Sequence, residues 1–331
     1  MGKRRTPIDW KSYNNELVNR GTRFARIVED FKANEPLLRD ELESMNEGKI
    51  GGQFLYPDTV IVFLATIKIC TMKGYRWVEG FAHLFLDNVP SYTQICRRFA
   101  SLPGELLAKL EQESVCSAVR GPTIDVILDA TGVQINGKSV WIDEKFKTRR
   151  KRKWKKLHIV IDRQSRAILS LRVIGKDKHE GESEEFRASL RSAKSRLPES
   201  VKIEKVFGDS GYDSVDNFDN CKKENIKPII RVRKSTIAKL KREKDINEQL
   251  LLCGRRLERE YTYRDKCAIE QINWDEFVEK SGYGKRSVEE GVIGSFKRTF
   301  GENVYSRVEG AILRECRLKG VIWNWMIGMI G

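Results

Sequence analysis

The chain has 331 residues, enough for one large domain or two ordinary ones. Lys and Arg number 62 against 47 Asp and Glu, and this formal net charge of +15 favours a polyanionic partner such as nucleic acid. Seven scattered cysteines without a CxxC pair argue against a disulfide framework and a structural zinc site. The N-terminus lacks a secretory signal, and no apolar run reaches the ~20 residues that span a bilayer, so we expect a soluble cytoplasmic protein without a membrane partner.

The first third of the chain predicts helices. Residues 1–115 are expected to form an α-helical N-terminal domain, with three helix-like stretches around 59–101. A Pro-Ser pair at residues 90–91 is a typical start for the third of them. Three short helices with tight connections fit a helix-turn-helix module, whose third helix would present Arg97 and Arg98 to DNA. A helical domain with a packing role only is the alternative that this pattern leaves open.

The pattern changes at about residue 122 and predicts an α/β domain over 122–331. Runs rich in β-branched residues, bounded by turn residues, indicate three strands, a helix, a strand, a helix, a short strand and a late helix. That order is the order of the ribonuclease-H-like fold, in which helices flank a mixed sheet. Residues 232–281 interrupt it, and because a bare loop of that length is rare in a compact domain, we expect a partly helical insertion there.

Three carboxylates stand where an enzyme that cuts phosphodiester bonds needs them. Asp129 ends the apolar run of TIDVILDATG, Asp209 ends that of VKIEKVFGDSGYDS, and Glu290 lies in a helix-like segment. Carboxylates on two strand ends and one helix can converge on a pair of Mg²⁺ ions that act on phosphodiester bonds. Asp129, Asp209 and Glu290 are therefore the candidate metal ligands and catalytic residues.

Each of these carboxylates has rivals nearby. Asp125 shares the strand face of the first aspartate by the period of two, but the Ala-Thr-Gly after the first aspartate marks the strand end and leaves room for metal and phosphate. Asp213 and Asp216 follow the second aspartate, which ends its strand directly. Glu289 precedes the helical glutamate but falls among the apolar positions of the helix. A single aspartate at a strand end usually caps a turn.

The segment around Glu290 carries a further pattern, Y-x2-R-x3-E-x6-K, formed with Tyr283, Arg286 and Lys297. On a helix the Arg, the Glu and the Lys fall within about 40° of one another, so one edge offers a metal ligand and two cations for phosphate oxygens. Tyr283 is expected before the helix and could contact DNA. The apolar residues form a stripe on another side: Val288, Val292, Phe296 and Phe300. An amphipathic helix with ordinary salt bridges is the alternative.

A basic tract follows the first predicted strand. KFKTRRKRKWKK, at residues 145–156, carries nine basic residues in twelve and no acid. Because the tract is close in sequence to the first aspartate, we expect it to contact the DNA backbone rather than to form only a solvated hairpin. Trp154 could stack on a base or fill a half-buried strand position. The candidate contacts in the tract are Arg149, Arg150, Lys151, Arg152 and Lys153.

Together, the two aspartate segments and the Tyr-Arg-Glu-Lys signature resemble the DDE transposases of bacterial and archaeal insertion sequences, in the branch that carries this signature. VPSYTQICRR and LRECRLKGVIWNW also resemble this family, so the resemblance covers nearly the whole chain. It implies a DNA-associated homodimer that binds terminal inverted repeats and target DNA.

The resemblance also implies the chemistry. Two Mg²⁺ ions, replaceable by Mn²⁺, would be held by Asp129, Asp209 and Glu290 for DNA cleavage and strand transfer. Two alternatives remain. One is a non-catalytic DNA-binding protein derived from a transposase, and the other is a fold-related nuclease that cuts without joining.

Overall fold

The computed structural model describes residues 34–135, 153–174, 182–253 and 260–328, together with scattered positions between 11 and 31. The chain divides into two compact units, one of residues 1–102 with the last three residues and one of residues 103–328. In these described ranges, no helix is both long and apolar enough to cross a bilayer.

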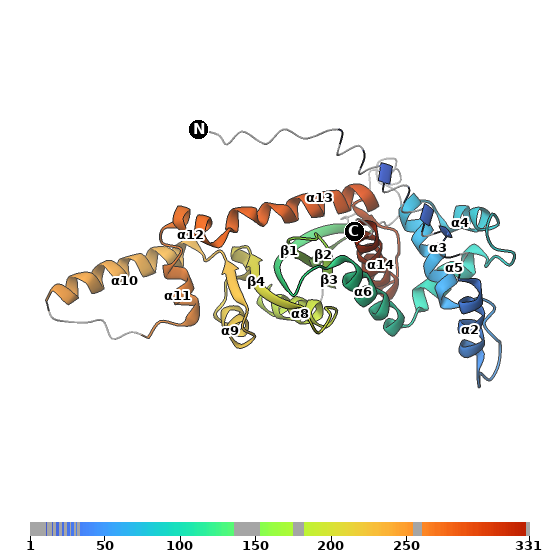
Figure 1. The fold of residues 1–331 in the computed structure, drawn as a ribbon, viewed down its shortest axis with the longest axis horizontal. Coiled ribbons are helices and arrows are strands. Elements are labelled where there is room, and N and C mark those ends of the chain that lie inside the picture. The colour runs from blue at the N-terminus through green and yellow to red at the C-terminus, as the bar shows by residue number, and fades with distance from the viewer. Residues whose placement is uncertain are drawn as a thin grey trace. The chain divides into compact units, whose positions relative to one another are not determined.

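The first unit is helical, and the three helix-like stretches predicted around 59–101 are present as helices (Figure 1). Its elements are α2 (Glu35–Asn46), α3 (Asp58–Thr71), α4 (Tyr75–Ala82) and α5 (Tyr92–Ser101). Helix α3 is apolar on nearly all sides and forms the centre of this unit, where Phe63 stacks on Phe31 at 3.8 Å between ring centroids. Ser91 caps α5: its Oγ accepts a hydrogen bond from the Gln94 backbone, and the Gln94 side chain accepts one from the Ser91 backbone at 3.0 Å.

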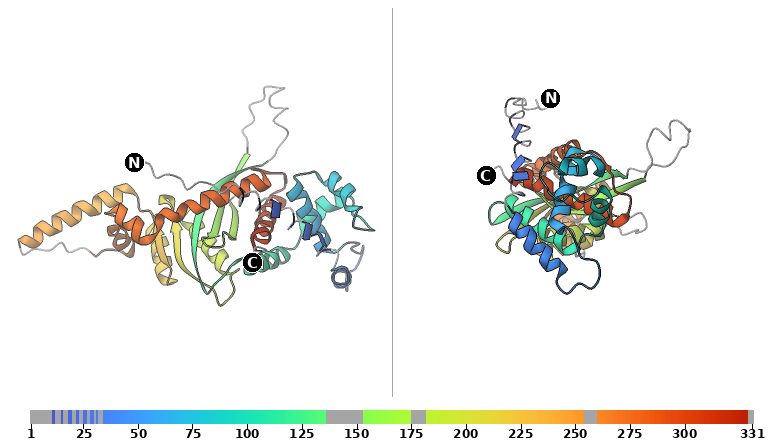
Figure 2. Two further views of the ribbon diagram at one scale, coloured as in Figure 1. Left: turned by 45° about the horizontal axis from the view of Figure 1, so that its top comes forward. Right: turned by 90° about the vertical axis from the view of Figure 1, so that its right-hand side faces the viewer.

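The second unit is built on one mixed sheet. Its strands are β1 (Thr123–Ile135), β2 (Lys153–Asp162), β3 (Ile168–Ile174), β4 (Lys202–Gly208), β5 (Lys227–Ile230) and β6 (Asn303–Val304). The strand order is β3-β2-β1-β4-β5, and β6 pairs with the far end of β1. Strands β1 to β3 are antiparallel neighbours, whereas β4 runs parallel to β1 and β5 runs parallel to β4. This is the predicted ribonuclease-H-like α/β fold, seen from two further directions in Figure 2.

Helices cover the two faces of this sheet, and β1 shows which residues meet them. Leu128 faces one core, which includes Phe186 of α8 (Glu182–Lys194). Ile127 faces the other core, against which Val288 of α13 (Val288–Phe300) packs. Alternation along the strand thus puts the odd-numbered residues of this part of β1 on the face of α13.

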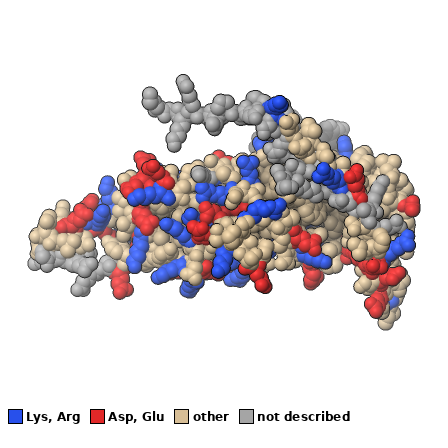
Figure 3. Space-filling model, in the orientation of Figure 1, with Lys and Arg blue, Asp and Glu red and all other residues tan. Residues whose placement is uncertain are grey.

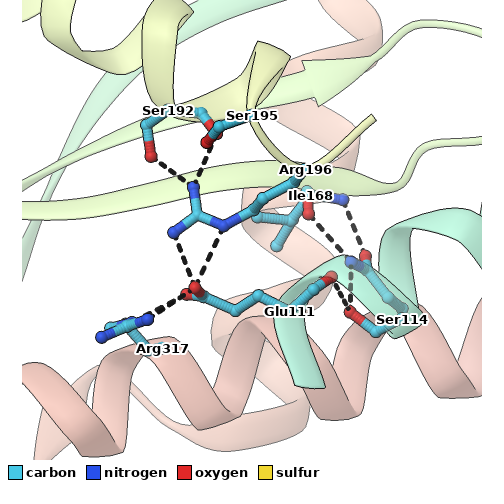
Figure 4. A network of polar contacts seen from close by, with 8 residues as sticks. Glu111, Ser114, Ile168, Ser192, Ser195, Arg196 and Arg317 are labelled. Atoms are coloured by element: carbon cyan, nitrogen blue, oxygen red, sulfur yellow. Dashed lines mark hydrogen bonds and ion pairs between the residues drawn. The ribbon is translucent and has the colours of Figure 1, made fainter. Parts of the chain in front are cut away.

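The boundary between the units falls earlier than the sequence suggests. Helix α6 (Gly104–Ala118) packs against α14 (Glu309–Gly328) and β3, so it belongs to the sheet-containing unit and not with the N-terminal helices. The buried carboxylate of Glu111 on α6 accepts hydrogen bonds from Arg196, which follows α8, at 2.6 Å and from Arg317 on α14 at 2.7 Å (Figure 4). One acid therefore ties three helical segments together.

The stretch between β5 and α13 is largely helical. It contains α10 (Lys234–Leu252), α11 (Tyr263–Ile269) and α12 (Trp274–Ser281), followed by a short 3₁₀ turn, η2 (Tyr283–Ser287). Helix α10 projects away from the sheet of its unit (Figure 1), and α11 packs against its base and against α9 (Val215–Lys223).

Candidate active site

The register of two parallel strands brings two of the predicted acids to the same level. Ile127 of β1 lies opposite Phe207 of β4 in the parallel ladder, and Asp129 and Asp209 each come two residues later. Since side chains alternate along a strand, both aspartates follow the face of Ile127 and Phe207, which is the face that α13 covers. Asp129 is still within β1, whereas Asp209 directly follows β4.

The backbone after β4 orients the second aspartate. Asp209 caps a single 3₁₀ turn, η1 (Ser210–Tyr212), and its Oδ1 accepts a hydrogen bond from the Gly211 backbone at 2.9 Å. The carboxylate therefore keeps its second oxygen for another partner, and its direction depends on how the turn is held.

Glu290 lies in the first turn of α13, which runs over the same face of the sheet (Figure 2). The predicted apolar stripe is present, because Val292, Phe296 and Phe300 are all buried. The Glu290 side chain is exposed, so it can reach a ligand over the sheet. The side chain of its rival Glu289 lies outside the described residues.

The α-helix begins later than the sequence pattern suggests, because Arg286 lies in the 3₁₀ turn η2 and not in α13. Tyr283 explains this start. Its ring packs edge-on against Trp274 at 5.2 Å between centroids, and its hydroxyl donates to the carbonyl of Gly208 at 3.4 Å. Tyr283 thereby anchors the turn on the end of β4, and Arg286 lies over its ring at 5.9 Å. Tyr283 therefore has a packing role within the chain, and its contact with DNA stays a prediction.

The three acids and Arg286 share one electrostatic environment. Burial raises the pKa of Asp129 above its ordinary value, while the Ala130 backbone N–H and the Arg286 guanidinium lower it. The negative charges of Asp209 and Glu290 raise the same pKa. Asp209, Arg286 and Glu290 are thus each near enough to Asp129 to act on its charge. We call Asp129, Asp209 and Glu290 the carboxylate cluster.

The donors of this cluster suit hard cations. All three offer carboxylate oxygens, which Mg²⁺ and Mn²⁺ prefer. Within the described ranges, no three His, Cys, Asp or Glu side chains lie close enough to hold one metal ion together. Mg²⁺ is usually held by one or two protein carboxylates, with water and substrate phosphates filling its other positions, so a third protein ligand on the same ion is not required.

The rival aspartates have other partners or positions. Asp125 forms an ion pair with Arg163 at 2.8 Å. Asp213 is buried and bonded to Arg264 at 2.6 Å, and Asp216 lies exposed in the first turn of α9. Asp125 and Asp213 are thus engaged in ion pairs, and Asp216 lies on a helix beyond the strand end, so the geometry favours Asp129 and Asp209 over them.

The predicted DNA contacts fall in different settings. Lys297 is half-buried in the last turn of α13, 3.9 Å from the Glu302 carboxylate. Arg97 is exposed on α5, but Arg98 turns inward, where it bonds Asp58 at 2.6 Å and the carbonyl of Tyr56 at 3.1 Å. Of this pair, only Arg97 is displayed on the surface of its unit.

The basic tract is largely beyond the part of the chain that the structure describes. Arg149, Arg150, Lys151 and Arg152 lie outside the described residues, and so does the side chain of Lys153, which begins β2. Trp154 is 42% exposed and lies over Gly132, where an added Cβ would come within 3.2 Å of the indole. A side chain at position 132 would require the indole to shift by a few tenths of an ångström, a relationship that no local sequence signal reveals.

Two arginines near the site were not singled out from the sequence. Arg163 lies between Asp125 and the ring of Phe207, 4.9 Å from the ring centroid, and lines a cavity of about 570 Å³ next to η2. Arg264 bonds the turn that carries Asp209. Both arginines lie far in sequence from the residues they contact, so only the folded chain brings them together.

A ribonuclease-H-like sheet with acids on two adjacent strands and on a facing helix defines the class of DDE-type domains. Residues 120–325 match the family model of the transposase DDE domain, and the chain belongs to that family.

Solved structures with a similar arrangement include a chain of the simian T-cell lymphotropic virus intasome in complex with a PP2A regulatory subunit (17% identity, TM-score 0.26), with 63% of this chain and 66% of that chain covered. The Drosophila P element transposase strand transfer complex has 12% identity and a TM-score of 0.31, with 87% and 68% covered. The Mos1 transposase paired-end complex has 10% identity and a TM-score of 0.24, with 71% and 82% covered. The chain thus spans just under two thirds of the viral intasome chain.

Proposed function

We propose that this transposase is the enzyme of an insertion sequence, which binds terminal inverted repeats and catalyses metal-dependent DNA cleavage and strand transfer. One observation carries the proposal: the β1–β4 register sets Asp129 and Asp209 at one level, and burial and the charges of Asp209, Glu290 and Arg286 all act on the pKa of Asp129. Repulsion of Asp129 by two other acids is unfavourable for folding, and a carboxyl whose pKa is raised by burial and by specific neighbouring charges is typical of a functional site.

Asp129 with Asp209, and Asp129 with Glu290, are the pairs that would hold two divalent ions, Mg²⁺ or Mn²⁺. When bound, such ions make water or a 3′-hydroxyl a stronger nucleophile and stabilise the leaving oxygen. The chain's own contribution is placement. The β1–β4 register sets the two aspartates at one level, and α13 brings the glutamate over them.

Arg286 supplies the positive charge beside the cluster. Its guanidinium lowers the pKa of Asp129 and so favours the ionised carboxylate that a metal requires. A guanidinium also matches phosphate oxygens in geometry, so Arg286 is suited to hold the phosphate that is cut. Lys297 lies further along α13 and would contact the same strand at a more distant phosphate.

Double-stranded DNA is the partner that the charge of the chain favours. The net charge is +15, yet on the face shown in Figure 3 basic and acidic side chains are interspersed. Binding is therefore expected to depend on particular cations: Arg286, Lys297, Arg97 and the tract from Arg149 to Lys153. A homodimer that holds both ends of the element follows from the family resemblance, as does a DNA-associated location in the cytoplasm.

The carboxylate cluster weighs against one of the two alternatives and is neutral toward the other. A non-catalytic DNA-binding derivative needs no acids close together, and in such a protein their repulsion would lower the folding stability without serving any function. A nuclease that cuts without joining needs the same cluster, so only the products of the reaction separate it from a transposase.

The test is a reaction with labelled duplex DNA that carries the element's own flanking ends, in Mg²⁺, Mn²⁺ or EDTA. The proposal expects cleavage at 3′ ends in either metal, followed by joined products, and neither in EDTA. Cleavage without joining would favour the nuclease, and specific binding without cleavage would favour the non-catalytic derivative.

A further inference from the structure

The turn that carries Asp209 is fastened at its far end to the inserted helices. Asp213 follows the turn, and its side chain is fully buried. Arg264 of α11 grips both of its carboxylate oxygens, with Nε 2.6 Å from Oδ1 and Nη2 2.7 Å from Oδ2. The backbone N–H of Arg233, just before α10, donates to Oδ2 at 3.0 Å, and Arg264 also donates to Thr236 Oγ1 at 3.1 Å.

The near part of the same turn is fixed to the sheet. Tyr212 is buried, and its hydroxyl lies 3.2 Å from Nδ1 of His158 on β2. His158 pairs across the strands with Ala130, the residue after Asp129. The Asn217 side chain donates to the carbonyl of Tyr212 at 2.9 Å. The sheet thus holds Tyr212, the last residue of the turn, and the insertion holds Asp213, the residue after it.

Asp209 precedes both fixed residues, and its carboxylate takes its direction from the turn itself. Its Oδ1 is bonded to the Gly211 backbone, in the middle of the segment from Asp209 to Asp213. A shift at Asp213 therefore moves the N–H that orients the carboxylate. Metal sites tolerate misplacement of a ligand poorly. Mutation of a residue that orients a ligand therefore typically lowers metal affinity by about 10–100-fold.

The chemistry of the pair fits a role in geometry. Burying a charge is costly, and a buried ion pair often adds little net stability compared with apolar residues of the same size. A two-pronged Arg–carboxylate contact does, however, fix the relative orientation of its two partners. Here the partners are the end of the Asp209 turn and the base of the insertion.

We propose that Asp213 and Arg264 are positioning residues that hold the Asp209 carboxylate in its metal-binding orientation, and that the insertion of residues 232–281 acts on the site through this ion pair. The inference rests on the function proposed for Asp209. It assigns a role to the insertion that neither composition nor the helical pattern of that segment suggests.

A purely structural ion pair is the competing explanation, and the chain offers a matched control for it. Glu111, paired with Arg196 and Arg317, is also a buried acid held by arginines in the same unit, but it lies among α6, α8 and α14. Glu111→Gln should therefore lower stability as Asp213→Asn does, without touching the Asp209 turn.

The experiment titrates the full-length protein with Mn²⁺ and follows the free ion by electron paramagnetic resonance, alongside thermal unfolding. Asp209→Ala defines the binding that depends on the cluster. We expect Asp213→Asn and Arg264→Gln to raise the Mn²⁺ dissociation constant about tenfold, and Glu111→Gln to leave it unchanged while lowering the unfolding midpoint. Arg264→Lys keeps the charge but loses the two-pronged contact, and should give a smaller increase.

The outcomes separate the inference from the function beneath it. Wild-type Mn²⁺ affinity in both Asp213→Asn and Arg264→Gln, or equal weakening in Glu111→Gln, overturns the positioning role alone. If Asp213→Asn does not fold, Arg264→Lys decides, and unchanged affinity in that variant overturns the role. If the wild type binds Mn²⁺ no better than Asp209→Ala does, the proposed metal site itself fails and the inference falls with it.

Discussion

Asp129 and Asp209 stand at one level on adjacent parallel strands, each two residues beyond the paired Ile127 and Phe207. Their level is a consequence of strand register, because neighbouring parallel strands carry equivalent residues side by side. With Glu290 over the same face, this concentrates negative charge around Asp129, and the Arg286 guanidinium offsets part of it. The cluster is therefore expected to trade stability for function.

Asp129→Asn should abolish DNA cleavage. It should also stabilise the metal-free protein, because it removes a charge that Asp209 and Glu290 repel. The gain should be only about 0.5 kcal/mol, since a partly exposed charge is well screened. The pKa of Asp129 in the folded chain is raised above 3.8, mainly by burial. Just above pH 3.8 the folded state thus binds more protons than the unfolded state, and this group lowers stability as pH rises through that window. Urea unfolding in EDTA, measured from pH 4 to pH 7, checks the difference between variant and wild type.

The pH-dependent difference should vanish in a comparison of Asp129→Asn with Asp129→Ala, because neither variant titrates at this position. A metal-free Asp129→Asn protein that is less stable than wild type across the whole range would show that the cluster is not under repulsive strain.

Arg97 and Arg98 are neighbours on α5 with opposite expected roles. Arg98 bonds Asp58 and the Tyr56 carbonyl and lies over the Phe54 ring, so Arg98→Ala should destabilise the N-terminal unit by about 2 kcal/mol. Arg97 is exposed, and Arg97→Ala should change stability by less than about 0.5 kcal/mol.

DNA binding separates the pair further. If α5 faces DNA, Arg97→Ala should weaken binding in a mobility-shift assay and reduce its dependence on salt, because one phosphate contact is lost. Unchanged affinity and salt dependence in that variant would favour the purely structural interpretation of the N-terminal helices.

The buried Glu111 is expected to contribute strongly to the stability of the second unit. Glu111→Ala leaves Arg196 and Arg317 without their shared acid and should cost about 3–5 kcal/mol of unfolding free energy. Lys109→Ala, which removes an exposed pair with Glu113 on the same helix, should cost less than about 0.5 kcal/mol. Chemical denaturation of both variants measures the contrast. A loss in Glu111→Ala as small as that in Lys109→Ala would show that the network of Figure 4 contributes little.

Local patterns were sufficient to predict most of the fold. Alternating and apolar runs in β1 to β5 are strong periodic signals, and the apolar stripe of α13 is plain in the sequence. The start of α13 was harder to predict, because the contact of Tyr283 with Gly208 and Trp274 keeps Arg286 in a 3₁₀ turn. Such a contact joins segments far apart in the chain and leaves no local pattern.

The same reasoning explains which side-chain roles were missed. Arg98 is a basic residue on the helix expected to face DNA. Its partner Asp58, however, lies 40 residues earlier, where it begins α3. Arg264 lies in a mixed-charge stretch that reads as a solvated helix, and only the fold brings it to Asp213. The assignment of α6 to the second unit likewise depends on α14, which comes almost 200 residues later.

A comparison of Glu290 with its neighbour Glu289 tests the central claim, that Asp129, Asp209 and Glu290 form one catalytic cluster. The measurement is the rate of Mg²⁺-dependent cleavage of DNA with the element's ends by Glu290→Gln and, as a matched control, by Glu289→Gln. We predict loss of cleavage of at least about 10³-fold in Glu290→Gln, with DNA binding retained, and a near wild-type rate in Glu289→Gln. Cleavage that survives in Glu290→Gln, or that is lost only in Glu289→Gln, would contradict the account.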